Sequence, residues 1–118
     1  MQLELSHLAG EAFCYLTTTG RISGRPHTIE IWFALHGQTL YMLSGGRERA
    51  DWVKNAGQSP TVTVKIQEQL FTGQARLVKS RAEDALARQL IGEKYQPSEA
   101  NLEGWLQSSL PVAVDLQP

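Results

Sequence analysis

The sequence predicts an α+β domain whose short antiparallel strands close into a small barrel. Strand-like segments come first, one helix interrupts them, and a helical segment precedes a last strand. This order is typical of antiparallel sheets with flanking helices rather than of parallel α/β winding. Six short strands in 118 residues are most economically closed into a barrel, because closure leaves no exposed edge. With 42% hydrophobic residues and no linker, residues 1–118 are expected to form one domain.

The first half of the chain is expected to hold a short leading helix and three strands. Leu3, Leu5 and Leu8 indicate the helix. Aromatic and β-branched residues, alternating with polar ones, indicate the strands. These strands are expected over Glu11–Thr19, Thr28–Leu35 and Thr39–Leu43. The second of them is long, which suits a curled sheet, and a turn at 36–38 would join it to the third as a hairpin.

The next predicted elements are a helix and two further strands. The spacing predicts a helix over Arg47–Ala56, with Gly57 ending it in a left-handed conformation. Alternating apolar and polar residues predict strands over Thr61–Ile66 and Leu70–Val78, and Gly73 indicates a bulge in the second.

The end of the chain is expected to form two helices and a closing strand. Ser80 and Glu83 have the spacing of a capping box, which predicts a helix from there to about Tyr95. A second helix over Ser98–Ser109 and a strand over Pro111–Leu116 follow. The apolar side of the first helix is predicted to contain Ala82, Ala85, Leu86, Leu90 and Ile91.

Composition restricts the partners that the chain can have. The formal net charge of −1, from 11 basic and 12 acidic residues, gives no global positive field for nucleic acid or an anionic membrane. The one cysteine, Cys14, cannot form an internal disulfide and leaves no thiol set for a metal, which fits a reducing cytosol. The sequence shows no secretion-signal pattern and no apolar run of membrane-spanning length. A cytoplasmic protein is therefore expected.

Two segments rich in arginine and glycine are the candidate binding site. Glycines let backbone N–H groups approach an anion, hydroxyls donate further hydrogen bonds, and an arginine fork matches phosphate oxygens. The second segment directly precedes a predicted helix, whose N-terminus favours anions. A single arginine in a turn is usually just solvated, so the indication comes from the cluster. The candidate residues are Thr19, Arg21, Ser23, Gly24, Arg25, His27, Ser44, Gly45, Gly46 and Arg47.

No catalytic residue can be assigned from the sequence. There is no Gly-x-Ser-x-Gly motif, and Cys14 lies between two aromatic residues without a base pattern around it. His27 and His36 have odd spacing on one predicted strand, and no cysteine or carboxylate pattern completes a metal site. Trp32 could stack on a planar ring, but ordinary packing is the favoured interpretation.

Taken together, the motifs resemble the split β-barrel flavin- and deazaflavin-dependent oxidoreductases, in particular their deazaflavin-dependent nitroreductase and quinone reductase branch. The resemblance covers most of the chain. It is carried, in order, by Thr18–Pro26, the hairpin through Trp32 and Tyr41, Ser44–Gly46, Asp51–Asn55 and Pro60–Val64. It implies a six-stranded antiparallel split β-barrel with flanking helices, the fold of pyridoxamine 5'-phosphate oxidase-like proteins.

The resemblance also implies an activity and a cofactor. The expected activity is transfer of hydride from bound deazaflavin, coenzyme F-420, to a small electrophile such as a quinone, nitroaromatic or enone. The cofactor ring carries the hydride, so the protein needs no acid/base dyad. FMN is the alternative cofactor, because Ile22 and His27 stand where the family often has basic residues. In this interpretation the two loops hold the cofactor phosphate, Trp52 and Asn55 fix the helix behind it, and the protein is a homodimer.

Other functions remain open on the residues alone. The chain could be a non-catalytic flavin-binding barrel, or a barrel whose arginines bind single-stranded nucleic acid, although the near-neutral charge argues against the latter. Alternatively, an apolar strand face such as Ile29–Leu35 could form a dimer interface around empty loops. The salt dependence of binding distinguishes a nucleic-acid-binding protein from a cofactor-binding one, since nucleic-acid affinity falls steeply with salt.

Overall fold

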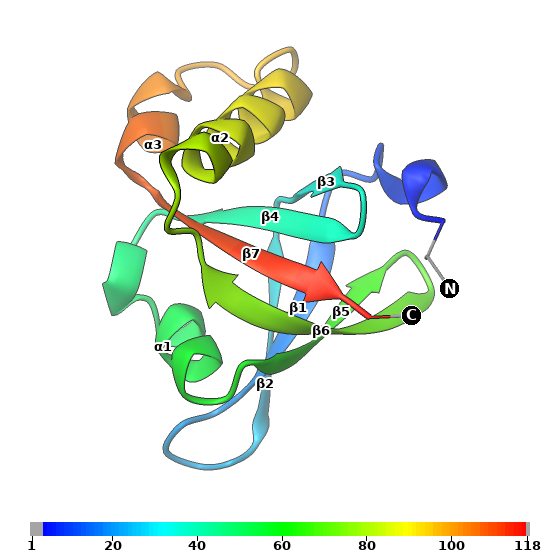
Figure 1. The fold of residues 1–118 in the computed structure, drawn as a ribbon, viewed down its shortest axis with the longest axis vertical. Helices are drawn as coiled ribbons and strands as arrows, with labels where there is room; N and C mark the ends of the chain where they lie inside the picture. The colour runs from blue at the N-terminus through cyan, green and yellow to red at the C-terminus, as the bar shows by residue number, and fades with distance from the viewer. Residues whose placement is uncertain (1–3, 118) are drawn as a thin grey trace.

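The computed structural model describes residues 4–117 and shows a curled antiparallel sheet with helices on its outer side (Figure 1). The strands are β1 (Cys14–Thr19), β2 (Pro26–Ile31), β3 (Ala34–His36), β4 (Thr39–Ser44), β5 (Thr61–Ile66), β6 (Gln69–Leu77) and β7 (Leu110–Leu116). The helices are α1 (Asp51–Gln58), α2 (Arg81–Tyr95) and α3 (Glu103–Ser108), and two short 3-10 turns are η1 (Ser6–Leu8) and η2 (Arg47–Arg49).

The sheet curls because its two edge strands are consecutive in the chain. The strand order is β2-β1-β5-β6-β7-β4-β3, so β2 and β3 lie at opposite edges. Only Trp32 and Phe33 separate them. The long strand predicted over residues 28–35 is therefore bent in the middle: its first part pairs with β1 and its last part with β4. This bend accounts for seven strands where six were expected, and it confirms the curled, barrel-like sheet.

The core fills the inside of the curled sheet. Alternate residues of β1, β5 and β7 point inward, in agreement with the predicted strand periodicity. The largest fully buried side chains include Phe33, Leu16, Leu40 and Met42. On the outside, α2 and α3 pack over β4 and its neighbours through Ile91, Tyr95 and Trp105, among others.

The bend between β2 and β3 is fixed by the end of α2. Trp32 stacks on Tyr95 with ring centroids 4.2 Å apart and an interplanar angle of 3°, and it meets Trp105 edge-on at 5.7 Å. The Tyr95 hydroxyl accepts a hydrogen bond from the Phe33 N–H (3.1 Å), while Lys94 Nζ donates to the Phe33 carbonyl (2.8 Å). Trp32 thus packs against Tyr95 and Trp105, which agrees with the predicted packing role.

The capping box at the start of α2 is confirmed, because Ser80 Oγ accepts from the Glu83 N–H at 3.0 Å. Other helix predictions need correction. Two residues assigned to the apolar side of α2, Ala82 and Ala85, are exposed, and the buried face instead contains Ala87, Ile91, Gly92 and Tyr95. The last helix spans only Glu103–Ser108 rather than Ser98–Ser109.

The two glycines singled out as structural breaks behave differently from the prediction. Gly57 does not end a helix: α1 begins at Asp51, after an extended Ala50, and continues through Gly57 to Gln58. Gly73 does not form a bulge, because β6 remains in register on both sides, with Gly73 opposite Val62 and Leu116. Its lack of a side chain serves close packing, since a Cβ there would lie 2.5 Å from Val114 Cγ1.

The leading helix is a 3-10 turn at Ser6–Leu8, and Leu3 lies outside the described residues. Within residues 4–117, no helix combines the length and apolar character that crossing a bilayer requires.

Candidate functional site

The first arginine- and glycine-rich segment forms a tight loop between β1 and β2. Gly20 N–H donates to the Arg25 carbonyl and Gly24 N–H to the Gly20 carbonyl, both at 2.8 Å. Gly24 has φ +74°, a conformation that a residue with a Cβ rarely adopts. Ser23 Oγ accepts from the Arg25 N–H at 3.1 Å. The loop is therefore closed by its own hydrogen bonds.

Helix α1 holds this loop through Arg21. Asn55 Oδ1 accepts from both the Arg21 backbone N–H (3.1 Å) and the guanidinium (2.9 Å). A second guanidinium nitrogen lies 3.0 Å from Asp51 Oδ1. Asn55 is buried, and its amide donates to Thr18 Oγ1 at 3.3 Å. Asp51 and Asn55, four residues apart on one face of α1, thus fix the position of Arg21.

A cavity of about 240 Å³ lies between the loop and α1, and three of the candidate residues, Arg21, Ser23 and His27, line it. His27 Nε2 lies 3.4 Å from Ser23 Oγ. The imidazole also covers Gly20, where an added Cβ would come within 2.5 Å of Nε2. Gly20 therefore leaves the space that the His27 ring occupies. The remaining lining residues are Gly20, Ile22, Asp51 and Asn55.

The other three candidates of this segment lie around the same turn without lining the cavity. Thr19 ends β1 opposite Pro26, and Gly24 forms the turn itself. Arg25 is exposed, and its guanidinium has no hydrogen bond or ion pair with any residue in 4–117. Among the cations of the loop, Arg21 is already paired, whereas Arg25 is available to a ligand.

The second segment, at the end of β4, faces α3. Ser44 is buried and its hydroxyl donates to the Arg47 carbonyl at 3.0 Å. Gly45 lies beside the Trp105 indole, whose Nε1 would be 3.4 Å from an added Cβ. Gly46 is exposed. Arg47, at φ 53°, donates to the Ser108 carbonyl at 2.7 Å and has its Nε 3.4 Å from a Glu48 carboxylate oxygen.

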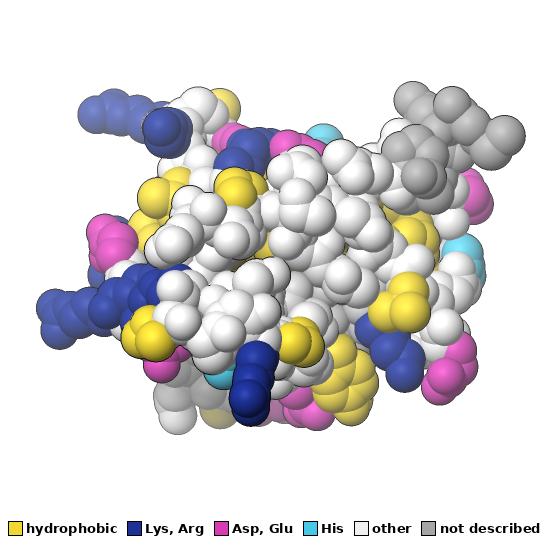
Figure 2. Space-filling view, turned by 90° about the horizontal axis from the view of Figure 1, so that it is seen from below, with side chains coloured by type: hydrophobic (Ala, Val, Ile, Leu, Met, Phe, Trp, Pro, Cys, Tyr) yellow, Lys and Arg dark blue, Asp and Glu magenta, His cyan; other side chains and the backbone are white. Residues whose placement is uncertain are grey.

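The second segment leads directly into η2 and α1, and α1 holds the first segment through Arg21. Arg47 begins η2, and α1, which binds Arg21, starts at Asp51. Within residues 4–117, no hydrogen bond or ion pair joins the two segments directly, and the cavity beside Arg21 is not lined by residues 44–47. The face in Figure 2 shows Lys and Arg side chains at several separate places rather than in one continuous patch.

The donor set at the first loop fits a phosphate group. A guanidinium, a hydroxyl and an imidazole converge on one small cavity, and each can donate a hydrogen bond to an anionic oxygen. Asp51 is the opposing charge, but its side chain is 84% exposed and can turn toward solvent. Sequence reasoning missed this carboxylate as the partner of Arg21; the i, i+4 spacing of Asp51 and Asn55 was the available signal.

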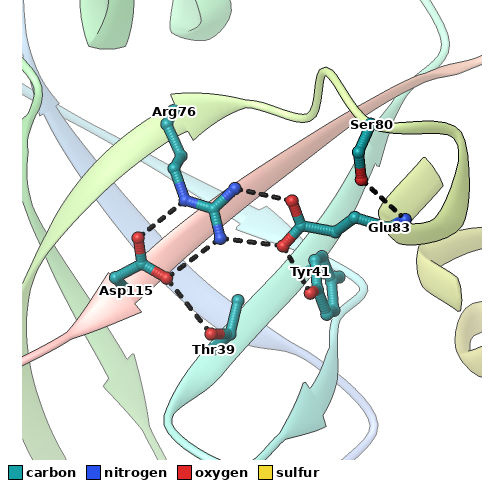
Figure 3. A network of polar contacts seen from close by, with 6 residues as sticks. All are labelled: Thr39, Tyr41, Arg76, Ser80, Glu83 and Asp115. Carbon is teal, nitrogen blue, oxygen red and sulfur yellow. Dashed lines mark hydrogen bonds and ion pairs between the residues drawn. The ribbon is translucent and has the colours of Figure 1, made fainter.

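A second polar cluster, away from both loops, joins four elements (Figure 3). The Arg76 guanidinium contacts Glu83 Oε1 and Asp115 Oδ2, each at 2.7 Å. Tyr41 donates to Glu83 Oε2 at 2.7 Å, and Thr39 donates to Asp115 at 3.1 Å. Hydrogen bonds from Arg76 and Tyr41 lower the pKa of Glu83 to about 2. Burial, together with the hydrogen bond to Glu83, raises the pKa of Tyr41 to about 12.

Comparison with known proteins gives one matching family and several solved structures. The model of a family described as F420H(2)-dependent quinone reductase matches residues 4–117. An F420-H2 dependent reductase has TM-score 0.71 and 20% identity, covering 87% of this chain and 93% of the other. A protein from Listeria innocua, described as a candidate pyridoxamine 5'-phosphate oxidase, has TM-score 0.71 and 17% identity, with 97% and 90% covered. A heme storage protein from Vibrio cholerae has TM-score 0.75 and 17% identity, with 100% and 92% covered. These structural likenesses show the split-barrel fold.

Proposed function

The chain belongs to the F420H(2)-dependent quinone reductase family, and from this premise we propose that its Arg21 loop binds the phosphate of the cofactor. The protein is an oxidoreductase that uses deazaflavin, coenzyme F-420, to reduce a small electrophile. When bound, the deazaflavin supplies the hydride, and the protein supplies binding, orientation and electrostatics. The absence of an assignable acid/base dyad in the sequence agrees with this division.

The observation that carries the proposal is the cavity of about 240 Å³ with three convergent donors. Arg21, Ser23 and His27 would hold the phosphate, and the unpaired Arg25 would approach it from the rim. Asn55 orients Arg21, because its buried carbonyl oxygen accepts from both the backbone and the side chain of that residue. Because Gly20 has no Cβ, it leaves the space that the His27 imidazole occupies. A charged hydrogen bond of this kind contributes about 1.5–3 kcal/mol.

The second loop, Ser44–Arg47, is proposed to contact the same cofactor further from the phosphate. Gly45 and Gly46 are exposed and carry no side chain, so a planar group can approach the backbone beside Trp105. Ser44 holds the loop by donating to the Arg47 carbonyl. A quinone is the proposed acceptor, in keeping with the family description.

The test is a binding titration with oxidised coenzyme F-420, followed by its fluorescence. The double variant Arg21→Ala/Arg25→Ala should bind at least about tenfold more weakly, since two charged contacts are lost. Arg81→Ala is the matched control, because this exposed arginine lies at the start of α2, away from both loops. Unchanged affinity in the double variant would remove the proposed phosphate site. FMN titrated in parallel tests the alternative cofactor, and a repeat at high salt tests for a purely electrostatic interaction.

We also propose that the protein forms a homodimer through the outer face of β1, β5 and β6. This face presents Tyr15, Lys65 and Leu70 in one register row. Tyr15 is 39% and Leu70 67% exposed, and Phe13 packs edge-on against Tyr15. One structural neighbour, 21% identical, is described as a domain-swapped dimer.

Leu70→Lys tests this interface, because it places a second ammonium next to Lys65 on the face. Native mass spectrometry should show dimers of the original protein and mainly monomers of the variant, since a like-charge row opposes association. Leu77→Lys, at another exposed leucine further along β6, is the control. A monomeric original protein, or a dimeric Leu70→Lys variant, contradicts the interface.

A further inference from the structure

A second cavity, of about 350 Å³, lies on the side of α1 that faces away from the Arg21 loop. Asp51 and Asn55 face that loop, whereas Val53, Ala56 and Gly57 line this cavity. At 3.6 residues per turn, these two sets lie on different faces of the helix. Figure 1 shows α1 beside the end of β6, and β6 provides the opposite wall. We refer to this space as the α1–β6 cavity.

The walls of the α1–β6 cavity are apolar, and small residues create the space. The apolar lining consists of Val53, Ala56, Pro60, Ala75, Leu77 and Val112. Gly57 is exposed at the cavity, and a Cβ added there would have no atom within 4 Å, so a larger side chain has room at this position. A volume of about 350 Å³ lies within the range of small-molecule pockets and has room for a short acyl chain or a ring.

One charge at the edge of the cavity is unpaired. Three charged residues line it: Glu48, Arg76 and Lys79. Arg76 is neutralised by Glu83 and Asp115 (Figure 3), and Glu48 lies 3.4 Å from Arg47 Nε. Lys79 is exposed and has no hydrogen bond or ion pair with the part of the chain described, residues 4–117. The cavity therefore combines apolar walls with a single available ammonium.

We propose that the α1–β6 cavity binds an apolar monocarboxylate, with its hydrocarbon part against Val53, Ala56 and Ala75 and its carboxylate at Lys79. Burial of the hydrocarbon supplies the main driving force, and the ammonium fixes the orientation of the molecule. A neutral molecule of the same shape would leave Lys79 unused, which makes the charge a basis for discrimination. This site is separate from the phosphate site, because the two lie on different faces of α1.

The probe is octanoate, titrated into the protein by isothermal calorimetry, with octanol as its neutral counterpart. Octanoate should bind saturably at one site, and Gly57→Leu should abolish binding by filling the cavity. Because Gly57 is inside a helix with open space at its Cβ, leucine should be accommodated without loss of the fold. Gly104→Leu is the matched control, since it too is a helical glycine with no atom within 4 Å of an added Cβ.

Lys79→Met tests the charge. It should weaken octanoate binding about tenfold, as expected for the loss of one charged contact, and leave octanol binding unchanged. Coenzyme F-420 titrations of the same variants check that the other site is intact, so failure here is distinguishable from failure of the phosphate site. The proposal is overturned if octanoate does not saturate, if Gly57→Leu binds it as the original protein does, or if Lys79→Met binds it unchanged.

Discussion

Gly73 and Gly57 show why the same residue type has opposite roles in different places. Gly73 lies in β6, where an added Cβ would meet Val114 Cγ1 at 2.5 Å and the Asp115 carbonyl oxygen at 2.9 Å. The backbone oxygen cannot yield without disturbing the pairing of β6 with β7. Gly57 lies in the last turn of α1, where an added Cβ meets no atom within 4 Å.

Alanine at these two positions should therefore change stability in opposite directions. Gly73→Ala should lower the free energy of unfolding by about 1–3 kcal/mol through overpacking. Gly57→Ala should raise it by up to about 1 kcal/mol, because alanine is the better helix former. Urea unfolding at pH 7 measures both. A Gly73→Ala variant as stable as the original protein would contradict the close approach of β6 and β7.

At the residue scale, the sequence identified local chemistry but not the partners of each side chain. Arg21, Ser23 and His27 are predicted from seven consecutive residues, and all three line one cavity. The partner of Arg21, Asp51, lies thirty positions further along the chain. Likewise, Arg47 donates to the carbonyl of Ser108, which is 61 positions away. Contacts of this length depend on the complete fold, so residue spacing alone cannot predict them.

At the element scale, a local signal predicted the start of α2 correctly, whereas the predicted starts of α1 and α3, at Arg47 and Ser98, lie several residues before the observed ones. The capping box marks the start of α2 because its hydrogen bond joins residues only three positions apart. The predicted end of α1 at Ala56 was wrong, since the helix continues through Gly57 to Gln58. A glycine is tolerated within the helix because packing of Val53 and Ala56 holds the helix in place. The break between β2 and β3 lacks any glycine or proline signal, since aromatic packing against α2 imposes it.

The Glu83 carboxylate connects α2 to the sheet, and its contribution to stability depends on pH. Its pKa is lowered from 4.5 to about 2 by hydrogen bonds from Arg76 and Tyr41. A folded-state pKa below the unfolded value means that the stabilisation is fully present above about pH 4.5. It is lost as the pH falls from there toward 2, because the unfolded chain then binds more protons than the folded one.

Glu83→Gln should therefore be less stable than the original protein at pH 7 and equally stable near pH 2. The loss at pH 7 is expected to be about 1 kcal/mol, because Arg76 is 40% exposed and solvent screens the pair. Thermal unfolding at a series of pH values gives the difference. Glu93→Gln, at an exposed position of the same helix, is the control and should show no such pH dependence. A difference that stays constant from pH 7 to pH 2 would exclude this role for the carboxylate.

At the scale of the whole molecule, closure of the sheet depends on one point of contact. The two edge strands meet at Trp32 and Phe33, and the end of α2 holds this point. The Tyr95 hydroxyl donates to the Ala12 carbonyl (2.8 Å) while accepting from the Phe33 N–H (3.1 Å). It thereby links the segment before β1, the bend and α2. Lys94 adds a hydrogen bond to the Phe33 carbonyl and lies over the Phe33 ring, and burial lowers its pKa to about 8.

The barrel itself could be predicted, whereas this contact could not. Six strand patterns in a short chain, with no parallel crossover signal, favour closure for a general physical reason: open edges are unfavourable. Where the closing strand bends is a particular consequence of Tyr95, which is 62 positions from Phe33 in the chain. That separation explains why the predicted strand over residues 28–35 was one element instead of two.

Tyr95→Phe should accordingly destabilise the entire fold rather than loosen α2 alone. The phenyl ring can keep its stacking on Trp32, but the buried Phe33 N–H loses its acceptor, which costs about 1–3 kcal/mol. Because the contact lies where the sheet closes, thermal unfolding should remain one transition at a lower temperature, with near-UV and far-UV circular dichroism changing together. Tyr15→Phe is the matched control: its ring is 39% exposed, and its hydroxyl has no hydrogen-bond partner within residues 4–117. Two separate transitions in Tyr95→Phe, with the sheet melting at its original temperature, would show that closure does not depend on this hydroxyl.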